Sequence, residues 1–230
     1  MELIGIIVPI LLLITSYLLG SIPFALIISK TFKGIDIREY GSKNMGATNT
    51  FRVLGPKYAV IVFVLDALKA SIIMLLFTSG LLDYQANWMI IKIHPIIYGL
   101  VAVIGHAFPI FADFKGGKGI ACSAGIALAF CPGILLIALT IFFIVLLISK
   151  YVSISSICAL GTAFVCSFFK LNNGKIDWVF VTAVFILWLF IIFLHRKNLV
   201  RIVKHEENKM DLLKHLKERK QRKKLENQKK

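Results

Sequence analysis

The chain has 230 residues, a hydrophobic fraction of 58%, a mean hydropathy of +0.81 and only 17% charged residues. A soluble domain of this length carries more charge, so the composition indicates a polytopic membrane protein. The formal net charge is +15, but residues 196–230 hold 14 basic and 5 acidic residues and supply +9 of it. This distribution excludes the uniformly basic surface of a nucleic-acid-binding domain, and no nucleic-acid partner is expected.

Apolar stretches of membrane-spanning length predict the helices of an all-α fold. They lie near residues 3–29, 58–82, 89–112, 120–149, 152–169 and 177–194. The first stretch has no basic residues before it, and its first lysines, Lys30 and Lys33, follow it. We therefore expect a retained first span and not a cleaved signal peptide.

The stretch 120–149 is too long for one upright span, because 30 residues of helix measure about 45 Å and the hydrocarbon core is about 30 Å thick. Cys131-Pro132-Gly133 interrupts it near the middle. Length alone leaves open one tilted span, two short spans or a re-entrant hairpin.

Basic residues decide between an odd and an even number of passes there, because Lys and Arg next to spans stay on the cytoplasmic side. With two passes, one face carries 6, 2, 1 and 14 basic residues, in segments 30–57, 113–119, 150–151 and 196–230. The opposite face keeps only Lys92, Lys170 and Lys175. This split of 23 against 3 predicts about seven transmembrane helices, one or two of them short, with the N-terminus outside and the C-terminus cytoplasmic. A re-entrant hairpin would keep the same parity.

Polar and glycine-rich segments gather on the basic face of this arrangement. They are Gly41–Asn49 followed by Arg52, Lys115–Gly119, Ser153 with Ser155 and Ser156, and His195–Asn198. Hydroxyls, amides, cations and glycine N–H groups are donors that bind phosphate. The sequence therefore predicts a phosphate-binding surface built from four loops.

The segment Lys115-Gly116-Gly117-Lys118-Gly119 is the most informative of these loops. Glycines let a backbone fold closely around an anion, two lysines add charge, and the N-terminus of the next helix follows at once. The spacing is not that of a Walker A loop, so nucleotide hydrolysis gains no support. An ordinary cytoplasmic loop with positive-inside lysines would have the same composition.

The segment around Ser42 to Asn49 has two interpretations, since Ser, Asn and Gly favour turns whatever the function. Arg52 weighs more, because a guanidinium matches phosphate oxygens in pairs. His195 and Asn198 lie three residues apart, which places them on one helical face at a membrane exit. His106, near Pro109, is interpreted as shaping the end of a helix.

Ionisable and sulfur-containing residues inside the apolar stretches complete the inventory. Asp66 and Lys69 lie three apart in the second stretch and are expected to form an ion pair with a structural or supporting role. The four cysteines have neither Cys-x-x-Cys nor Cys/His spacing. We expect no metal site and no cofactor.

Taken in order, these segments resemble the bacterial membrane acyltransferases that use acyl phosphate to acylate glycerol-3-phosphate. The resemblance covers roughly residues 17–207. It rests on Gly20-Ser21-Ile22-Pro23, on Gly41–Asn49 with Arg52, on Asp66 with Lys69, on Gly105-His106 running through Pro109 to Phe114–Gly119, on Val152-Ser153, and on His195-Arg196 with Asn198, Arg201 and Glu207.

The resemblance implies a seven-helix enzyme of the bacterial inner membrane whose active site opens to the cytoplasm. It would convert glycerol-3-phosphate and acyl phosphate into 1-acyl-glycerol-3-phosphate (lysophosphatidic acid) and phosphate, the first acylation of phospholipid synthesis. The residues implied in catalysis are Ser42, Arg52, Lys118, His195 and Asn198. Those implied in binding or supporting the substrates are Asn44, Gly46, Thr48, Asn49, Lys115, Gly116, Gly117, Ser153 and Glu207.

The expected chemistry needs no covalent nucleophile, because acyl phosphate is already activated. On this hypothesis the attacking hydroxyl loses its proton to the substrate's own phosphate or to His195, while Lys118 and Arg52 bear the developing charge. Two positions depart from the family pattern: Lys43 and His205 replace usual glycines, the latter two residues before Glu207.

We expect one membrane acyltransferase domain over residues 1–200 and a basic cytoplasmic tail over 201–230. Such a tail is attracted to anionic lipid headgroups, although a merely solvated extension has the same composition. A transporter of phosphorylated metabolites is the alternative from another functional class, and a relative with another acyl acceptor is the second alternative.

Overall fold

The computed structural model describes residues 2–169, 171–172 and 175–210, and within them the regular secondary structure is helical apart from one short hairpin. In the hairpin, β1 (Leu171–Asn172) pairs antiparallel with β2 (Lys175–Ile176). The α-helices are α1 (Glu2–Gly20), α2 (Phe24–Lys33), α3 (Ala47–Leu54), α4 (Pro56–Thr78), α5 (Pro95–Ala107), α6 (Ile120–Phe130), α7 (Pro132–Ser149), α8 (Val152–Ser167), α9 (Trp178–Leu194) and α10 (Arg196–Val203). Two 3-10 turns are η1 (Ile37–Glu39) and η2 (Ile110–Ala112). The all-α prediction is confirmed.

Four segments of the described chain are long and apolar enough to cross a membrane. They are Glu2–Lys33, Pro56–Thr78, Pro95–Ala112 and Pro132–Ser149. Helices α9 and α10 form a fifth candidate with a bend of 54°, and α6 and α8 are shorter apolar helices. The described residues thus hold seven apolar helical segments, as expected for a multi-pass integral membrane protein.

The first apolar stretch is not one straight helix, because α1 ends at Gly20 and α2 begins only after Pro23. Small residues let α1 and α5 touch backbone to backbone at this break. A Cβ on Gly20 would lie 2.1 Å from the carbonyl oxygen of Ala102, and one on Gly105 would lie 2.3 Å from that of Tyr17. The apolar stretch predicted near residues 3–29 is thus one candidate span, Glu2–Lys33, made of two helices.

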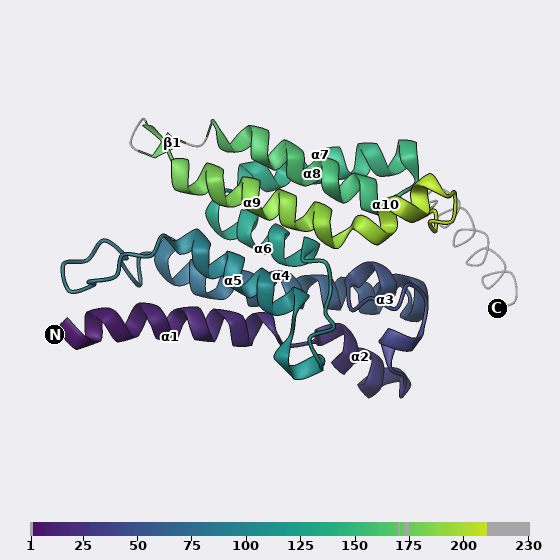
Figure 1. Cartoon of the computed structure of the whole chain (residues 1–230), viewed down its shortest axis with the longest axis horizontal. Coiled ribbons are helices and arrows are strands. Elements are labelled where there is room, and N and C mark those ends of the chain that lie inside the picture. Colours follow the sequence, from purple (N-terminus) through teal and green to yellow (C-terminus); the bar gives the residue numbers. More distant parts are fainter. Residues whose placement is uncertain (1, 170, 173–174, 211–230) are drawn as a thin grey trace, which may run out of the picture.

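The stretch 120–149 forms two helices, which the residues at the break explain. Helix α6 ends at Phe130, and Pro132 takes the first position of α7, where its missing N–H costs nothing. The 11 residues of α6 measure only about 16 Å, so it is a short helix. In Figure 1, α7 runs back antiparallel to α6, which agrees with the predicted even parity.

Figure 1 shows the helices as a bundle with nearly parallel axes. Helix α1 packs on α5, α5 on α4, α4 on α6, α7 on α8 and α8 on α9. The short helices α2, α3 and α10 lie at one end, and the N-terminus and the β-hairpin lie at the other (Figure 1). This arrangement places the polar segments at the end where α3 and α10 meet the bundle.

Helix α5 begins later than the predicted 89–112, at Pro95. His94 caps it, since its Nδ1 accepts a hydrogen bond from the N–H of Ile96 at 3.4 Å. Asp177 caps α9 in the same way, accepting from the N–H of Phe180 at 3.0 Å. Both caps satisfy N–H groups that a helix start leaves without a partner.

Candidate active site

A cavity of about 550 Å³ lies among α3, α4, α6, α7, α8 and α9. Its polar lining comes from segments far apart in the sequence: Ser42, Asn44, Gly46, Thr48, Asn49, Arg52, Asp66, His106, Lys118, Ser123, Ser153, Ser156, His195, Asn198 and Glu207. The rest of its lining is almost wholly apolar and comes chiefly from α6, α7, α8 and α9. The cavity therefore has a polar, cationic end and a long apolar part.

Eleven of the residues implied in catalysis or binding line this cavity, and three do not: Lys115, Gly116 and Gly117. The two glycines instead pack against the end of α5. The N–H of Gly117 donates to the carbonyl of His106 at 3.0 Å, and a Cβ on Gly116 would lie 2.0 Å from that same oxygen. These glycines fix the path of the loop that delivers Lys118, which differs from the expected amide cradle for phosphate.

Asn49 organises the segment that precedes α3. Its Oδ1 accepts from the N–H of Ser42 at 2.8 Å, while its Nδ2 donates to the carbonyls of Ile37 at 3.2 Å and Tyr40 at 3.1 Å. The side chain is 1% exposed. Because its amide is occupied by the loop itself, Asn49 holds Ser42 in place at the cavity.

Glu207 is the centre of the polar network. Its Oε1 accepts from Asn198 Nδ2 at 2.7 Å and from Ser153 Oγ at 3.2 Å, and its Oε2 pairs with Arg201 Nε at 2.7 Å. Lys118 in turn donates to the Oδ1 of Asn198. Helices α8 and α10 thus meet at one buried carboxylate, and Asn198 connects it to Lys118.

The segment after α10 is folded onto the site, and α10 crosses the domain boundary expected at residue 200. The N–H of Met210 donates to the carbonyl of Lys150 at 2.8 Å, which closes the segment over the start of α8. His205 takes a positive φ of 59° in this segment, and Lys43 takes 57° beside Ser42. Both residues that replace usual glycines therefore adopt the conformation that favours glycine.

His195 stands at the bend between α9 and α10, so it and Asn198 do not lie along one straight helix as predicted. Both nevertheless line the cavity. The Nδ1 of His195 lies 2.9 Å from the carbonyl oxygen of Ile191. Because a carbonyl only accepts, this contact requires a proton on Nδ1 and leaves Nε2 as an acceptor.

Burial and neighbouring charges set the protonation of the polar end, whose groups lie beyond the ends of the spanning helices. Burial is the main cause that lowers the pKa of Lys118 to about 8. The positive charges of Arg201 and Arg52 lower this pKa as well, whereas the negative charge of Glu207 acts to raise it. Burial and then Lys118 lower the pKa of His195 to about 4, so this imidazole is neutral near pH 7.

The remaining two charges at this end stay ionised. Burial lowers the pKa of Arg52, yet a guanidinium keeps its proton in proteins. Burial works to raise the pKa of Glu207, but hydrogen bonds from Arg201, Asn198 and Ser153 bring it below its usual range. The cavity therefore offers Arg52 and Lys118 to an anion, while Glu207 is bound by its own partners.

A buried polar cluster separates this end from α1. Lys69 Nζ lies 2.7 Å from Asp66 Oδ1, which confirms the predicted ion pair, and it donates to the carbonyl of Ile22 at 2.7 Å. His106 Nδ1 lies 3.5 Å from the same carboxylate. His106 was expected only to shape a helix end, but it also contacts Asp66, and both residues line the cavity.

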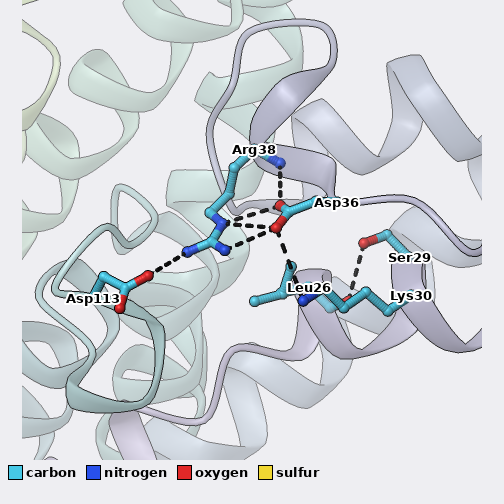
Figure 2. Close-up of polar contacts among 6 residues, drawn as sticks. All are labelled: Leu26, Ser29, Lys30, Asp36, Arg38 and Asp113. Atoms are coloured by element: carbon cyan, nitrogen blue, oxygen red, sulfur yellow. Dashed lines mark hydrogen bonds and ion pairs between the residues drawn. The ribbon is translucent and has the colours of Figure 1, made fainter.

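Figure 2 shows a second link between two loops that carry site residues. Arg38 Nη2 lies 2.8 Å from Asp36 Oδ2, and its Nη1 lies 3.1 Å from Asp113 Oδ2 in the loop that leads to Lys118. The hydrogen bond from Arg38 lowers the pKa of Asp36 to about 2. The bridge fastens the first polar loop to the second outside the cavity.

No group of three or more His, Cys, Asp and Glu side chains within 2–169, 171–172 and 175–210 is placed to hold a metal ion. The four cysteines, all in the described part, are unpaired with one another.

Comparisons with known proteins agree with this geometry. Residues 10–205 match the family model described as glycerol-3-phosphate acyltransferase. The chain belongs to this family. The glycerol-3-phosphate acyltransferase of Bacillus cytotoxicus is 44% identical over 205 residues, covering 89% of this chain and 96% of that protein. That of Geobacillus kaustophilus is 42% identical over 203 residues, covering 87% and 95%.

Solved structures of this acyltransferase family match the fold as well. The crystal structure of PlsY (YgiH), an integral membrane glycerol 3-phosphate acyltransferase, in its glycerol 3-phosphate form has a TM-score of 0.78 and 36% identity, covering 90% of this chain and 98% of that one. Its lysophosphatidic acid form has a TM-score of 0.74 at the same identity, covering 87% and 94%. The family resemblance predicted from the motifs is confirmed.

The sequence motifs did not predict two groups of residues at the acyltransferase site. Arg201 was noted in the motif but not assigned to the site, although its place three residues after Asn198 repeats the spacing from His195 to Asn198. The apolar lining was not foreseen residue by residue. Its signal is the helical spacing of Ser153, Ser156, Ala159, Leu160 and Ala163 along one face of α8, and of Phe180, Val184 and Leu187 along α9.

Proposed function

We propose that this chain transfers a fatty acyl group from acyl phosphate to the 1-hydroxyl of glycerol-3-phosphate. The products are 1-acyl-glycerol-3-phosphate and inorganic phosphate, so the enzyme performs the first acylation of phospholipid synthesis. Membership of the glycerol-3-phosphate acyltransferase family supports the acceptor and the product. The donor is proposed on chemical grounds, since acyl phosphate supplies both an activated carbonyl and a second anion for the cationic end.

The observation that carries the proposal is the division of one cavity into two chemistries. Arg52 and Lys118 stand at the polar end, where they bind the phosphates, and Ser42, Ser153 and Asn198 supply further hydrogen-bonding groups. The apolar part between α6 and α9 accepts the fatty chain. A long amphipathic anion fits such a site better than a small metabolite in transit does.

The reaction then needs positioning more than a covalent intermediate. The 1-hydroxyl oxygen attacks the acyl carbonyl carbon, the bond from that carbon to the phosphate oxygen breaks, and phosphate leaves with the electron pair. We assign the hydroxyl proton to Nε2 of His195, whose Nδ1 proton is held by Ile191. The two bound anions raise the pKa of this imidazole above its value of about 4 in the empty site, which makes it a better base once the substrates are bound. Lys118 and Arg52 stabilise the charge that develops on the carbonyl oxygen and the leaving phosphate.

We place the protein in the bacterial inner membrane with the polar end of the cavity facing the cytoplasm. The basic residues that flank the spans support this orientation. The basic stretch after residue 210 lies outside the described residues, and we propose from its charge alone that it contacts anionic headgroups.

The test is release of inorganic phosphate by detergent-purified protein given palmitoyl phosphate, with and without glycerol-3-phosphate. The proposal predicts that phosphate release requires glycerol-3-phosphate and yields lysophosphatidic acid. It also predicts that Lys118→Ala abolishes this release. These results together would support both the reaction and the site. The matched control is Lys115→Ala, which removes a neighbouring lysine outside the cavity and should leave most of the activity. No acceptor-dependent release from folded protein would contradict the proposal and direct attention to another acyl acceptor or to transport.

A further inference from the structure

We propose that an aromatic stack behind Phe180 closes the deep end of the cavity and sets the length of the acyl chain that the enzyme accepts. This inference rests on the proposed function, because it assigns the apolar part of the cavity to the fatty chain. It adds the residues that select among donors, which family membership does not identify.

The cavity is long enough for this role. On α9 the cavity is lined by Phe180, Val184 and Leu187, and His195 lines its polar end. Fifteen residues of helix separate Phe180 from His195, which is a rise of about 22 Å. The hydrocarbon core is about 30 Å thick, so Phe180 lies beyond its midplane as seen from the polar end, at a depth that only a long, extended acyl chain reaches.

Phe180 is the cavity-facing member of a column of contacting rings, in which Phe180 and Phe130 are stacked and the other pairs are tilted or edge-to-face. Its ring is 4.9 Å from that of Phe130 at an interplanar angle of 12°. Phe130 in turn lies 5.4 Å from His94, and His94 lies 5.5 Å from Tyr84. Of these four residues only Phe180 lines the cavity, so the other three rings stand behind it.

The column is fixed at its base by polar contacts. His94 Nε2 lies 3.3 Å from Asp177 Oδ2, and the other oxygen of this carboxylate accepts from the N–H of Phe180 at 3.0 Å. The starts of α5 and α9 are thereby tied together directly beneath the rings. Phe180 is 2% exposed, so its ring has little room to turn away from a chain that is too long.

A rigid wall discriminates chain length because each methylene beyond the wall has no apolar space to fill. When two substrates differ by one methylene, a hydrophobic pocket changes the ratio of their kcat/KM values by about tenfold or more.

Ala163 is the position where a larger side chain would shorten the cavity. It lines the cavity on α8 next to Phe164, whose ring contacts that of Phe185 at 5.1 Å, which places Ala163 part-way between Leu187 and Phe180.

The experiment measures kcat/KM with glycerol-3-phosphate and a series of donors: dodecanoyl, myristoyl, palmitoyl, stearoyl and arachidoyl phosphate. Phe180→Ala and the milder Phe180→Leu should shift the preferred donor toward longer chains, changing the ratio between neighbouring long donors by about tenfold. Ala163→Leu should shift the preference toward shorter chains. Because each ratio is taken within one preparation, partial misfolding does not alter it.

The control is Phe164→Ala, which removes a ring of the same size from the neighbouring stack with Trp188, outside the cavity lining. Its chain-length profile should match that of the unchanged protein. Profiles that stay the same in the Phe180 and Ala163 variants would overturn this inference while leaving the acyltransferase activity standing. Failure of the unchanged protein to use any acyl phosphate would contradict the proposed function itself.

Discussion

Lys118 donates a hydrogen bond to the side-chain oxygen of Asn198, joining two segments that are 80 residues apart in the sequence. The same Asn198 donates through its Nδ2 to Glu207 at 2.7 Å. The orientation of the amide is thereby determined by a cation on one side and a carboxylate on the other. A phosphate that enters the cavity meets a lysine whose position is already set, which reduces the cost of organising the site.

Glu207→Gln should lower kcat/KM by about 10–100-fold, mainly through a higher KM for the anionic substrates. The neutral amide keeps the shape of the side chain but loses the charge-assisted bond to Arg201, and such bonds contribute about 1.5–3 kcal/mol. Asn198 and Lys118 then lose their fixed orientation. Steady-state kinetics with both substrates varied would measure the effect.

The matched control for that change is Glu206→Gln, because Glu206 is the exposed neighbour of the buried carboxylate. It should keep activity within about twofold, as surface substitutions away from special features have small effects. Equal losses in the two variants would show that general charge in this segment matters and that the network around Glu207 does not.

The pH dependence of substrate capture should show a loss above pH 8, because the pKa of Lys118 is lowered to about 8 in the empty site. A bound phosphate favours the protonated lysine and so raises its pKa. Above pH 8 the empty site must therefore take up a proton when the phosphate binds, and kcat/KM falls by about tenfold for each further pH unit. Below pH 8 Lys118 is already charged and adds no dependence.

Lys118→Arg is the variant that isolates this effect. A guanidinium keeps its charge throughout the alkaline range, so whatever activity the variant retains should lose its fall near pH 8. A variant whose alkaline limb is the same as that of the unchanged protein would assign the titration to another group. The profile of kcat/KM reports the free enzyme, which is the state to which the lowered pKa refers.

His195→Ala should lower kcat by at least about 10²-fold, which is the usual contribution of a positioned general base. The KM values should change less, because the neutral imidazole carries no charge to the phosphates. His195→Gln separates proton transfer from orientation, since it keeps a polar side chain that cannot take up the proton. Recovery of activity in the Gln variant, or a fall below tenfold in the Ala variant, would assign the proton to the substrate's own phosphate.

The sequence allowed the helical membrane fold and most of the site to be predicted, for identifiable physical reasons. Apolar length defined the spans, and the asymmetry of Lys and Arg required an even number of passes in 120–149. Hydrogen-bonding and cationic residues then marked the polar loops, and the family resemblance singled out Ser42, Arg52 and Lys118 within them. These are properties that a local segment carries by itself.

What escaped prediction depends on contacts between distant segments. Gly116 and Gly117 have the composition of a phosphate cradle, but their space is taken by the end of α5. The contact of His106 with Asp66 joins α5 and α4. The column of rings that ends in Phe180 joins α9, α6 and the start of α5. The close approach of α5 to α1 at Gly20 and Gly105 leaves no space for side chains there. A linear pattern does not encode which neighbour will fill such a space.

Two departures from the family's glycines allow a final prediction about stability. Lys43 and His205 adopt φ values of 57° and 59°. The left-handed region costs a residue with a Cβ about 1–2 kcal/mol, whereas glycine adopts it freely but loses about 0.4–1 kcal/mol through its more flexible unfolded chain. Lys43→Gly and His205→Gly should therefore each raise the stability in detergent by roughly 0.5–1 kcal/mol.

The control for this prediction is Lys204→Gly, which lies next to His205 but has an ordinary φ of −82°. Glycine there relieves no strain and only adds flexibility to the unfolded chain, so this variant should unfold at a lower temperature. Thermal unfolding of the variants in one detergent measures the sign of each change. If His205→Gly and Lys204→Gly both lower the unfolding temperature, contacts of the His205 side chain outweigh its backbone strain, and the segment that carries Glu207 is held by that imidazole.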